Sequence, residues 1–407
     1  MNHSFHHRWA IGVILAFACL IRLHYVLTAY HEPIAWDQLE YTKLAIQLLE
    51  KGIYAYRDTE PNTLVTPGLP MFLAVIYGLV GYEPLEPALT VIRVLQCFLC
   101  LPAIWFLYMT GARLFQPAAG LLAALFAAVY PSYVWSTALI LTEVPFLSSL
   151  MAMVYVQVRI IQENRKTDHL WFGLLLGITV LIRPNVLPLA VVPYLFLWFT
   201  SHRKKALVYG LQAAAAFALV MLPWWVRNWL TFHEFIFIAK GEAGNPFLGG
   251  TDPYFRGTID WTAIDESDQM AEGLRRIKQG LIEQPLLWLK WMTVGKFTYF
   301  FRRLWVGPYP FYVPEWYYYA LNKLHFIIVY AGLALLPIMG VRSRAYAFLA
   351  VSFAIVCGVH LLFIPVDRYA YGMLPFLMLG TAHAAVVLIR YLFAFMEHIR
   401  LRVKRFG

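Results

Sequence analysis

Apolar runs of membrane-spanning length, or close to it, alternate with short polar segments along almost the whole sequence. A helix of about 20 apolar residues is long enough to cross the hydrocarbon core of a bilayer. The pattern therefore predicts an all-α, polytopic membrane protein. The runs lie at Trp9–Thr28, Pro67–Val80, Ala88–Thr110, Pro117–Trp135, Val144–Ile161, Leu170–Phe199, Ala206–Trp225, Leu286–Phe301, Ala320–Met339, Ala345–Ile364 and Met373–Phe395.

Basic clusters between the runs indicate which runs cross the bilayer, because Lys and Arg favour the cytoplasmic side. All clusters reach that side only if Pro67–Val80 and Leu286–Phe301 do not cross. We therefore expect these two runs to be helices lying at the outer interface. The clusters are Arg113; Arg159, Arg165 and Lys166; His202 to Lys205; Arg342 and Arg344; and Arg400, Arg402, Lys404 and Arg405.

The long run Leu170–Phe199 is interrupted by Arg183-Pro184-Asn185. A charge inside lipid costs about 2.5–3.5 kcal/mol on insertion scales, so two shorter helices meeting near the outer face are favoured. Trp9–Thr28 is too long for a signal-peptide core, lacks a cleavage site and is expected to remain as the first span. The prediction is a single membrane domain over residues 1–407, with about ten spans, cytoplasmic termini and outer loops at 29–87 and 226–319.

The composition supports a membrane protein and excludes several functions. Apolar residues make up 60% of the chain and charged residues only 14%, and the net charge of +10 follows from the clusters, which argues against a nucleic-acid partner. All four cysteines lie in apolar runs and are expected to be buried and free of metal. The sequence has no GxxxxGK[ST] and no HExxH motif, so ATP hydrolysis and zinc proteolysis lack support.

Two acids are predicted on the outer face. Asp37 lies in Trp36-Asp37-Gln38-Leu39-Glu40-Tyr41, where Asp37 and Glu40 share one side of a short helix. A carboxylate partly shielded by Trp36 and Tyr41 suits a general base that activates an acceptor hydroxyl for attack on a sugar carbon. The alternative is an exposed acid that caps the helix.

Glu143 is the second acid and follows Thr142 at a predicted helix start before Pro145. A negative charge there also stabilises the helix dipole, which is a purely structural alternative. Because the topology places Asp37 and Glu143 on one side of the membrane, the two acids can share a site, and binding of a metal ion by them stays open.

Cations on the same face are candidates for binding a phosphate leaving group. Arg183, Arg227 and Arg368 are the strongest, because each lies in a turn beside Trp, Pro or Tyr, whereas Arg22 and Arg93 can instead extend to lipid headgroups. The loop Gly241–Pro253 either folds over a ligand or simply connects two elements. The full set of cations is Arg22, Arg57, Arg93, Arg183, Arg227, Lys240, Arg256 and Arg368.

Several short motifs run in one order through nearly the whole chain. They are Leu20-Ile21-Arg22-Leu23, Asp37–Tyr41, Gly52-Ile53-Tyr54, Thr66–Ala74, Leu141-Thr142-Glu143, Gly177 to Arg183-Pro184, Pro223–Asn228, and Arg368-Tyr369 before Pro375. Together they make the sequence resemble bacterial members of glycosyltransferase family 39. This family belongs to the GT-C superfamily, with the protein O-mannosyltransferases and the lipid A aminoarabinose transferases.

The resemblance implies a GT-C-like fold and a monosaccharide donor linked to polyprenyl phosphate, with inversion at the anomeric carbon. Asp37 would activate the acceptor, and Glu143 would orient the acceptor or the sugar. Many relatives carry Arg where Thr66 stands, so Arg57 or another cation would supply that phosphate contact. The substrate-binding positions implied are Glu40, Tyr41, Arg57, Arg183, Arg227, Asn228, Arg368 and Tyr369.

By the same resemblance the protein lies in a bacterial inner membrane with its active site facing the periplasm. No cofactor is expected beyond a possible divalent cation. Relatives with a soluble outer C-terminal domain often use it for the acceptor; here a short basic tail follows the last span, so lipid, glycan and protein acceptors stay open. The alternative is a transporter or flippase of lipid-linked substrates, but such proteins tend to show repeated halves and acids near the bilayer midplane.

Overall fold

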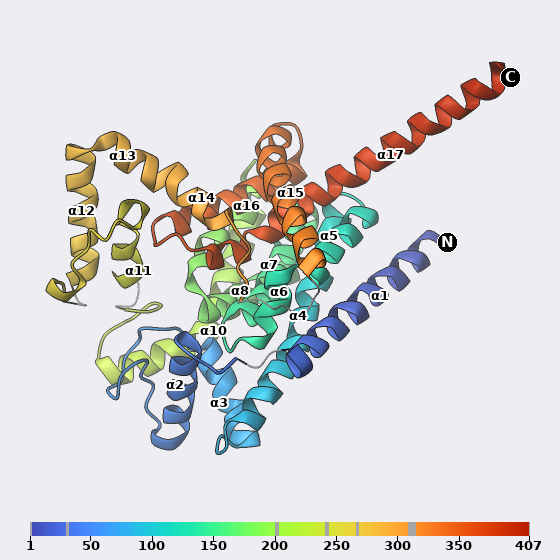
Figure 1. The fold of residues 1–407 in the computed structure, drawn as a ribbon. Helices are drawn as coiled ribbons and strands as arrows, with labels where there is room; N and C mark the ends of the chain where they lie inside the picture. Colours follow the sequence, from blue (N-terminus) through green and yellow to red (C-terminus); the bar gives the residue numbers. More distant parts are fainter. Residues whose placement is uncertain are drawn as a thin grey trace.

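The protein folds into a bundle of helices with a helical arm on one side (Figure 1). The computed structural model describes residues 2–29, 32–199, 203–240, 244–265, 268–307 and 315–406. Every regular element within these ranges is a helix, which confirms the predicted all-α class.

Seven helices are long and apolar enough to cross a membrane, and an eighth span results if α5 (Pro117–Val129) and α6 (Pro131–Trp135), which meet at a bend of 60°, count as one. The chain is therefore a multi-pass membrane protein. The seven are α1 (Asn2–His24), α4 (Glu86–Leu114), α7 (Glu143–Glu163), α10 (Arg203–Phe232), α15 (Glu315–Gly340), α16 (Arg344–Leu361) and α17 (Leu374–Phe406).

The predicted break at Arg183 is present. Helix α8 (Lys166–Ile182) ends there, and a 3-10 segment, η3 (Pro184–Val191), leads into α9 (Val192–Trp198). Arg183 is extended, with φ −146° and ψ 112°, as expected for a residue before proline. Counting α8 and the η3–α9 pair as two further spans gives the ten predicted from sequence, and the number of spans stays a prediction.

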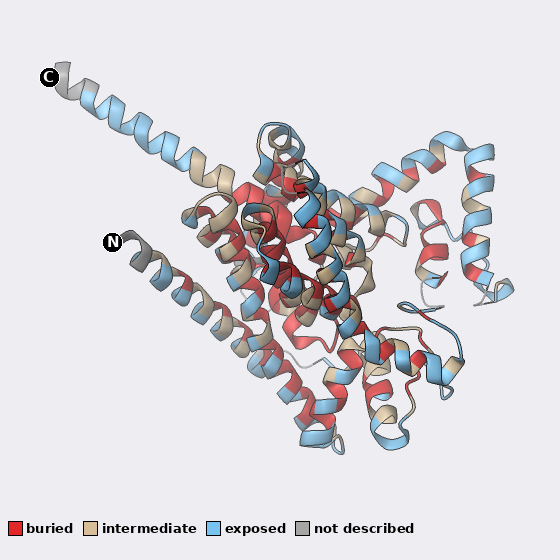
Figure 2. Cartoon of the chain, turned by 180° about the vertical axis from the view of Figure 1, so that it is seen from behind, coloured by how far each residue is buried: buried red, intermediate tan, exposed pale blue. Residues whose placement is uncertain are grey.

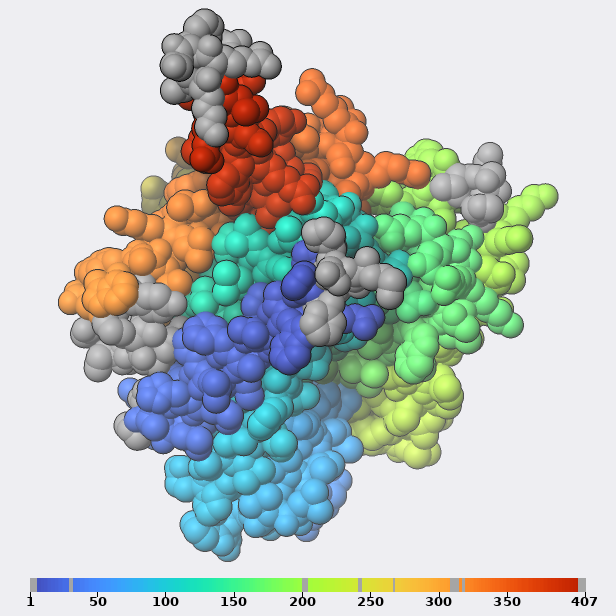
Figure 3. Space-filling view, turned by 90° about the vertical axis from the view of Figure 1, so that its right-hand side faces the viewer, coloured from blue at the N-terminus to red at the C-terminus, as the bar shows by residue number. Residues whose placement is uncertain are grey.

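Helix α7 is the centre of the bundle and the most deeply buried of the seven. It packs against α4 and α8, and α8 in turn packs against α10. Figure 2 shows the buried residues gathered in the middle of the molecule, with the far half of α17 mostly exposed and α1 exposed on part of its surface. In Figure 3 α1 lies on the surface of the bundle, and its outward apolar side chains, such as Trp9 and Leu20, fit a hydrocarbon surrounding.

The bend between α5 and α6 explains the position of the Arg22 side chain. Arg22 was expected on the outer face among the phosphate-binding cations. Arg22 is instead buried and donates hydrogen bonds to the carbonyl oxygens of Ala127 and Ala128, at 3.1 and 2.8 Å. Pro131 has no N–H for the Ala127 carbonyl, and the turn at Tyr130 ends the helical hydrogen bonding. Arg22 therefore stabilises the bend and is not available for a ligand.

Two shorter helices cover one end of the bundle on one side. These are α2 (Asp37–Lys51) and α3 (Gly68–Val80), which pack against each other. At about 1.5 Å per residue, α3 is too short to cross the hydrocarbon, in keeping with the expected interfacial position. Gly68 lies against α8: a Cβ atom there would come within 2.6 Å of the Leu181 carbonyl oxygen, so the loop before α3 sits directly beside Arg183.

The arm contains four helices and a π-helical turn. In the predicted loop Gly241–Pro253 the first three residues lie outside the described part of the chain, and the rest forms α11 and a turn. Ile364 N–H donates to the Pro246 carbonyl oxygen at 2.7 Å, which fixes this segment to the chain after α16. The arm comprises α11 (Gly244–Gly249), α12 (Gln269–Glu283), α13 (Pro285–Lys290), the π turn η7 (Trp291–Gly295) and α14 (Lys296–Phe301).

Candidate active site

Asp37 is the first residue of α2, and both of its carboxylate oxygens are occupied. Oδ2 accepts a hydrogen bond from Arg368 Nη1 at 2.9 Å. Oδ1 accepts from Arg57 Nη2 at 3.0 Å and from the Tyr56 hydroxyl at 3.5 Å. The Asp37 side chain keeps 36% of its surface exposed, so it is shielded but reachable from solvent.

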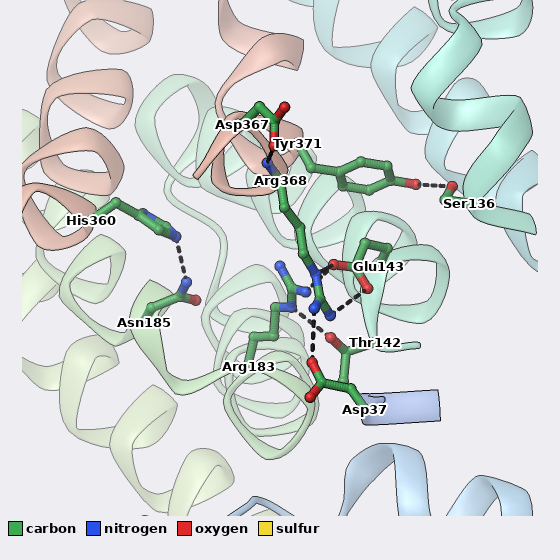
Figure 4. A network of polar contacts seen from close by, with 10 residues as sticks. All are labelled: Asp37, Ser136, Thr142, Glu143, Arg183, Asn185, His360, Asp367, Arg368 and Tyr371. Carbon is green, nitrogen blue, oxygen red and sulfur yellow. Dashed lines mark hydrogen bonds and ion pairs between the residues drawn. The ribbon is translucent and has the colours of Figure 1, made fainter. Parts of the chain in front are cut away.

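Glu143 is the first residue of α7 and its side chain is only 1% exposed. Arg368 donates to Glu143 from Nε and, at 3.3 Å, from Nη2. Arg183 pairs with the same carboxylate and also donates from Nε to the Thr142 hydroxyl at 2.6 Å. Arg368 therefore bridges the two acids (Figure 4).

Residues far apart in the sequence form this cluster because three helix ends meet at one level. Asp37 begins α2, Glu143 begins α7, and Arg183 follows α8. Arg368 lies in the 3-10 segment η8 (Asp367–Gly372), between α16 and α17. The prediction placed the acids and two of these arginines on one face, and the structure brings all four into direct contact.

Electrostatics hold Arg368 permanently charged. Burial alone would lower the pKa of Arg368, but the carboxylates of Glu143 and Asp37 outweigh it and raise the pKa above its ordinary value. Its guanidinium also lies 5.7 Å from the centre of the Trp305 ring. Nearby, burial raises the pKa of Tyr41 to about 12, so its hydroxyl stays protonated and is a donor at neutral pH.

An ion pair outside the predicted set positions Arg368. The Asp367 carboxylate accepts from Arg303 Nε at 2.5 Å and from the Arg368 backbone N–H at 3.1 Å. Neither Arg303 nor Asp367 was among the site residues predicted from the sequence. The acid directly before Arg368 was the one available signal.

A cavity of about 540 Å³ opens beside Asp37. Such a volume falls within the range of about 300–1,000 Å³ typical of small-molecule sites. Its charged lining residues are Glu32, Asp37 and Arg368, and three tryptophans also line it. The lining residues are Glu32, Pro33, Ala35, Trp36, Asp37, Gln38, Trp135, Leu139, Leu141, Trp305, Val306, Gly307 and Arg368.

Three other predicted positions lie near the cluster without joining it directly. Glu40 pairs with Lys43 at 2.8 Å and so points differently from Asp37, contrary to the expectation that both acids face one way. A spacing of three residues leaves the two carboxylates about 60° apart around the helix axis, enough for different partners. Tyr41 packs on Tyr56, with ring centres 5.3 Å apart, and Tyr369 packs on His360 at 5.0 Å.

Arg227 and Asn228 brace a loop. Arg227 donates to the backbone carbonyls of Asn62 and Tyr54 at 3.0 and 2.9 Å, and its guanidinium lies over the Tyr54 ring. Asn228 donates to the Ile236 carbonyl at 3.4 Å. The contacts of Arg227 join α10 to the loop that carries Arg57, whereas Asn228 holds the segment that follows α10. Neither residue enters the described cluster.

The remaining predicted cations are spread over other contacts. Lys240 pairs with Glu234 at 2.8 Å, and Arg93 donates to the Ala138 carbonyl at 3.1 Å. Arg256 lies over the Tyr254 ring. Of the eight candidate cations, three lie around the two acids: Arg57, Arg183 and Arg368.

The cluster does not fit a divalent cation held between the acids. The Arg368 guanidinium occupies the space between Asp37 and Glu143, and Arg183 and Arg57 take further carboxylate oxygens. Within the described ranges no group of three or more His, Cys, Asp or Glu side chains could hold a metal ion. The positive charge of this site comes from arginine.

A family model described as dolichyl-phosphate-mannose-protein mannosyltransferase matches residues 66–226. This interval is less than half of the chain; it contains Glu143 and Arg183 but neither Asp37 nor Arg368. No curated protein sequence matches the chain significantly.

Solved structures of the archaeal oligosaccharyltransferase AglB from Archaeoglobus fulgidus align along almost the whole chain. The complex with an inhibitory peptide and a dolichol-phosphate gives a TM-score of 0.58 at 15% identity, covering 97% of this chain and 52% of that chain. The protein has the GT-C fold. The GT-C-like fold that the resemblance implied is thereby confirmed.

Two further forms of the archaeal enzyme align with this GT-C protein in the same way. The apo form gives a TM-score of 0.58 at 14% identity, over 96% of this chain and 52% of that chain. The form tethered with an acceptor peptide containing the NVT sequon gives 0.53 at 16% identity, over 95% and 50%. The GT-C protein thus spans about half the length of the oligosaccharyltransferase chains that it matches.

Proposed function

We propose that this GT-C protein is a membrane glycosyltransferase that moves a monosaccharide from a polyprenyl-phosphate donor to an acceptor hydroxyl. The observation that carries the proposal is Arg368, which bridges a reachable carboxylate, Asp37, and a buried one, Glu143, at the wall of a cavity. The family description names a dolichyl-phosphate-mannose donor, and the archaeal relative was solved with a dolichol-phosphate, which supports a lipid-phosphate donor.

In the proposed reaction the acceptor oxygen bonds to the anomeric carbon from the side opposite the leaving group, so the configuration inverts. The bond from that carbon to the phosphate oxygen breaks, and its electron pair leaves with the polyprenyl phosphate. The acceptor proton passes to Asp37, the one acid of the pair with exposed surface. Guanidinium groups stabilise the negative charge that develops on the phosphate.

Glu143 acts indirectly, through the arginines that it binds. A side chain that is 1% exposed does not reach a ligand in the cavity, so Glu143 holds Arg368 and Arg183 in place instead of orienting the sugar or the acceptor itself. Its role differs in this respect from the role that the resemblance implied. Two arginines on one carboxylate leave guanidinium hydrogens free to face a phosphate.

Arg57 is the proposed replacement for the arginine that many relatives carry at the position of Thr66. Its side chain is 48% exposed while it contacts Asp37, and it lies on the loop over the site. A donor phosphate can therefore draw Arg57 away from Asp37 Oδ1 at little cost, which frees that oxygen to accept the acceptor proton.

The proposed setting is a bacterial inner membrane, with Asp37 and the cavity on the periplasmic side and both termini in the cytoplasm. The support is the distribution of basic clusters, which places the loop of Asp37 opposite to Lys166 and Lys204. Membrane lipid surrounds the bundle, and the acceptor class stays open among lipid, glycan and protein.

Transfer of a radiolabelled sugar tests the proposal. Purified protein is given a labelled polyprenyl-phosphate monosaccharide with a membrane extract as the source of acceptor. We expect labelled product with the wild type and a fall of at least about 100-fold in Asp37→Asn, as is usual when a general base is lost. Glu60→Gln, an exposed acid on the same loop, is the matched control and should transfer normally. Unchanged transfer in a folded Asp37→Asn variant removes Asp37 from the mechanism.

A further inference from the structure

Trp36 is an exposed indole at the entrance of the site. It directly precedes Asp37, and 88% of its surface is accessible. Its backbone has φ 52° and ψ −131°, a conformation that a bulky L residue rarely adopts. Trp36 also lines the cavity that holds Asp37 and Arg368, so its exposed ring is placed to contact a ligand there.

Two further tryptophans form the cavity wall that Trp36 borders. Trp135, at the end of α6, and Trp305, in the chain after α14, meet edge to face with ring centres 4.8 Å apart. Gly307 lies against this wall: a Cβ atom there would come within 2.6 Å of Trp135 Nε1. The absence of a side chain at Gly307 lets the chain press against the indole and fix its position.

The polar groups of the cavity lie beside these rings. Asp37 and Arg368 line the same space, and the Arg368 guanidinium lies 5.7 Å from the Trp305 ring centre. An apolar aromatic wall with a few converging charged groups suits a ligand that has one face of C–H groups and a rim of hydroxyls. A cyclic sugar has this combination, whereas a polyprenyl tail has no hydroxyl rim.

We infer that this tryptophan-walled cavity is the subsite for a sugar ring, with Trp36 stacking on the C–H face of the ring while Asp37 and Arg368 face its hydroxyl edge. The inference rests on the proposed function and adds to it the group that selects the substrate. Two sources supply the same chemistry: the monosaccharide on the donor lipid, and a sugar residue of a glycan acceptor.

Binding assays on detergent-solubilised protein separate these sources without requiring transfer. The probes are polyprenyl phosphates carrying a hexose or a pentose, bare polyprenyl phosphate, and the corresponding free methyl glycosides. For a subsite that holds the donor sugar, Trp36→Ala weakens binding of the sugar-bearing lipid by roughly three- to tenfold, as expected for one aromatic contact, and leaves binding of the bare lipid unchanged. Loss confined to the methyl glycosides instead assigns the subsite to an acceptor sugar.

Matched variants make the result specific. Trp36→Phe should restore part of the affinity, because it keeps an aromatic face. Trp229→Ala removes an indole that is 55% exposed on α10, outside the cavity lining, and should bind every probe as the wild type does. Thermal unfolding of each variant checks that it is folded.

The inference is overturned if Trp36→Ala weakens the sugar-bearing and bare lipids equally, which would place Trp36 against the lipid tail, or if no probe responds. It is also overturned if the wild type binds sugar-bearing lipids no more tightly than the bare lipid and does not bind the methyl glycosides either. Failure of the proposed function would look different. If the wild type binds sugar through Trp36 but transfers none, the proposed catalysis is refuted and the sugar subsite is not.

Discussion

At the scale of single residues, the two acids owe their different roles to burial. Asp37 keeps enough exposed surface to meet a substrate, while Glu143 is enclosed and paired with two arginines. Enclosed ion pairs are expensive to break, because removing one partner leaves the other charge in a low-dielectric surrounding without compensation. In the proposed mechanism, activity therefore also depends on Glu143, an acid that does not touch the substrate.

Replacing Glu143 should be the most damaging change in the cluster. Glu143→Gln removes the negative charge that Arg183 and Arg368 share, and we expect a loss of about 3–5 kcal/mol of folding stability together with a large loss of transfer. Thermal unfolding in detergent measures the stability. Glu163→Gln is the control, because the Glu163 carboxylate is 23% exposed in its pairs with Arg113 and Arg165. This substitution should reduce the folding stability much less. Equal destabilisation by the two substitutions would show that the buried ion pairs of Glu143 contribute no more to stability than the exposed pairs of Glu163.

At the scale of elements, the arm joins the bundle through α14, which carries a buried lysine. Lys296 is fully buried and donates from Nζ to the Leu361 carbonyl oxygen at 2.9 Å, at the end of α16. The chain then passes through Trp305 to the cavity. Burial lowers the pKa of Lys296 to about 7, so this junction is sensitive to pH.

The sign of that sensitivity follows from proton binding in the two states. Between pH 7 and about 10.4, the ordinary value for lysine, the unfolded chain binds more protons at Lys296 than the folded protein does. Stability from this group should therefore rise as the pH rises through that interval. We expect the melting temperature of Lys296→Met, measured between pH 6.5 and 9.5, to increase less with pH than that of the wild type. Parallel curves for the two proteins would contradict the pKa shift.

At the scale of the whole molecule, the position of the site at one end of the bundle predicts how the protein is oriented in the membrane. The cluster of Asp37, Glu143, Arg183 and Arg368 lies at one end of α7, and Lys166 follows the other end of that helix. If α7 crosses the membrane, the acids and Lys166 must face opposite compartments. The assignment of the acids to the periplasm can then be tested by labelling.

Cysteine labelling checks the orientation in intact cells, after the four native cysteines are replaced. Single cysteines at Glu60 and Lys278 should react with a membrane-impermeant maleimide, whereas cysteines at Lys166 and Lys204 should react only after the cells are opened. All four positions are exposed, so a lack of reaction cannot be due to burial. Labelling of Lys166 from outside would reverse the topology and move the proposed chemistry to the cytoplasmic face.

The sequence by itself determined the helical class, the break at Arg183 and the gathering of acids and arginines at one end of the bundle. The length of an apolar run, a proline and the charge of a loop affect only the local backbone or the position along the membrane normal. Their effects can therefore be predicted without knowledge of how the helices pack. Which cations meet the acids was decided only by the tertiary structure: Arg22 went to carbonyl groups at a bend and Arg227 to a loop. Arg368 became the bridge because η8 packs against α7 and the Arg368 side chain reaches from there to Asp37. Pairing at that distance along the chain depends on how the helices assemble.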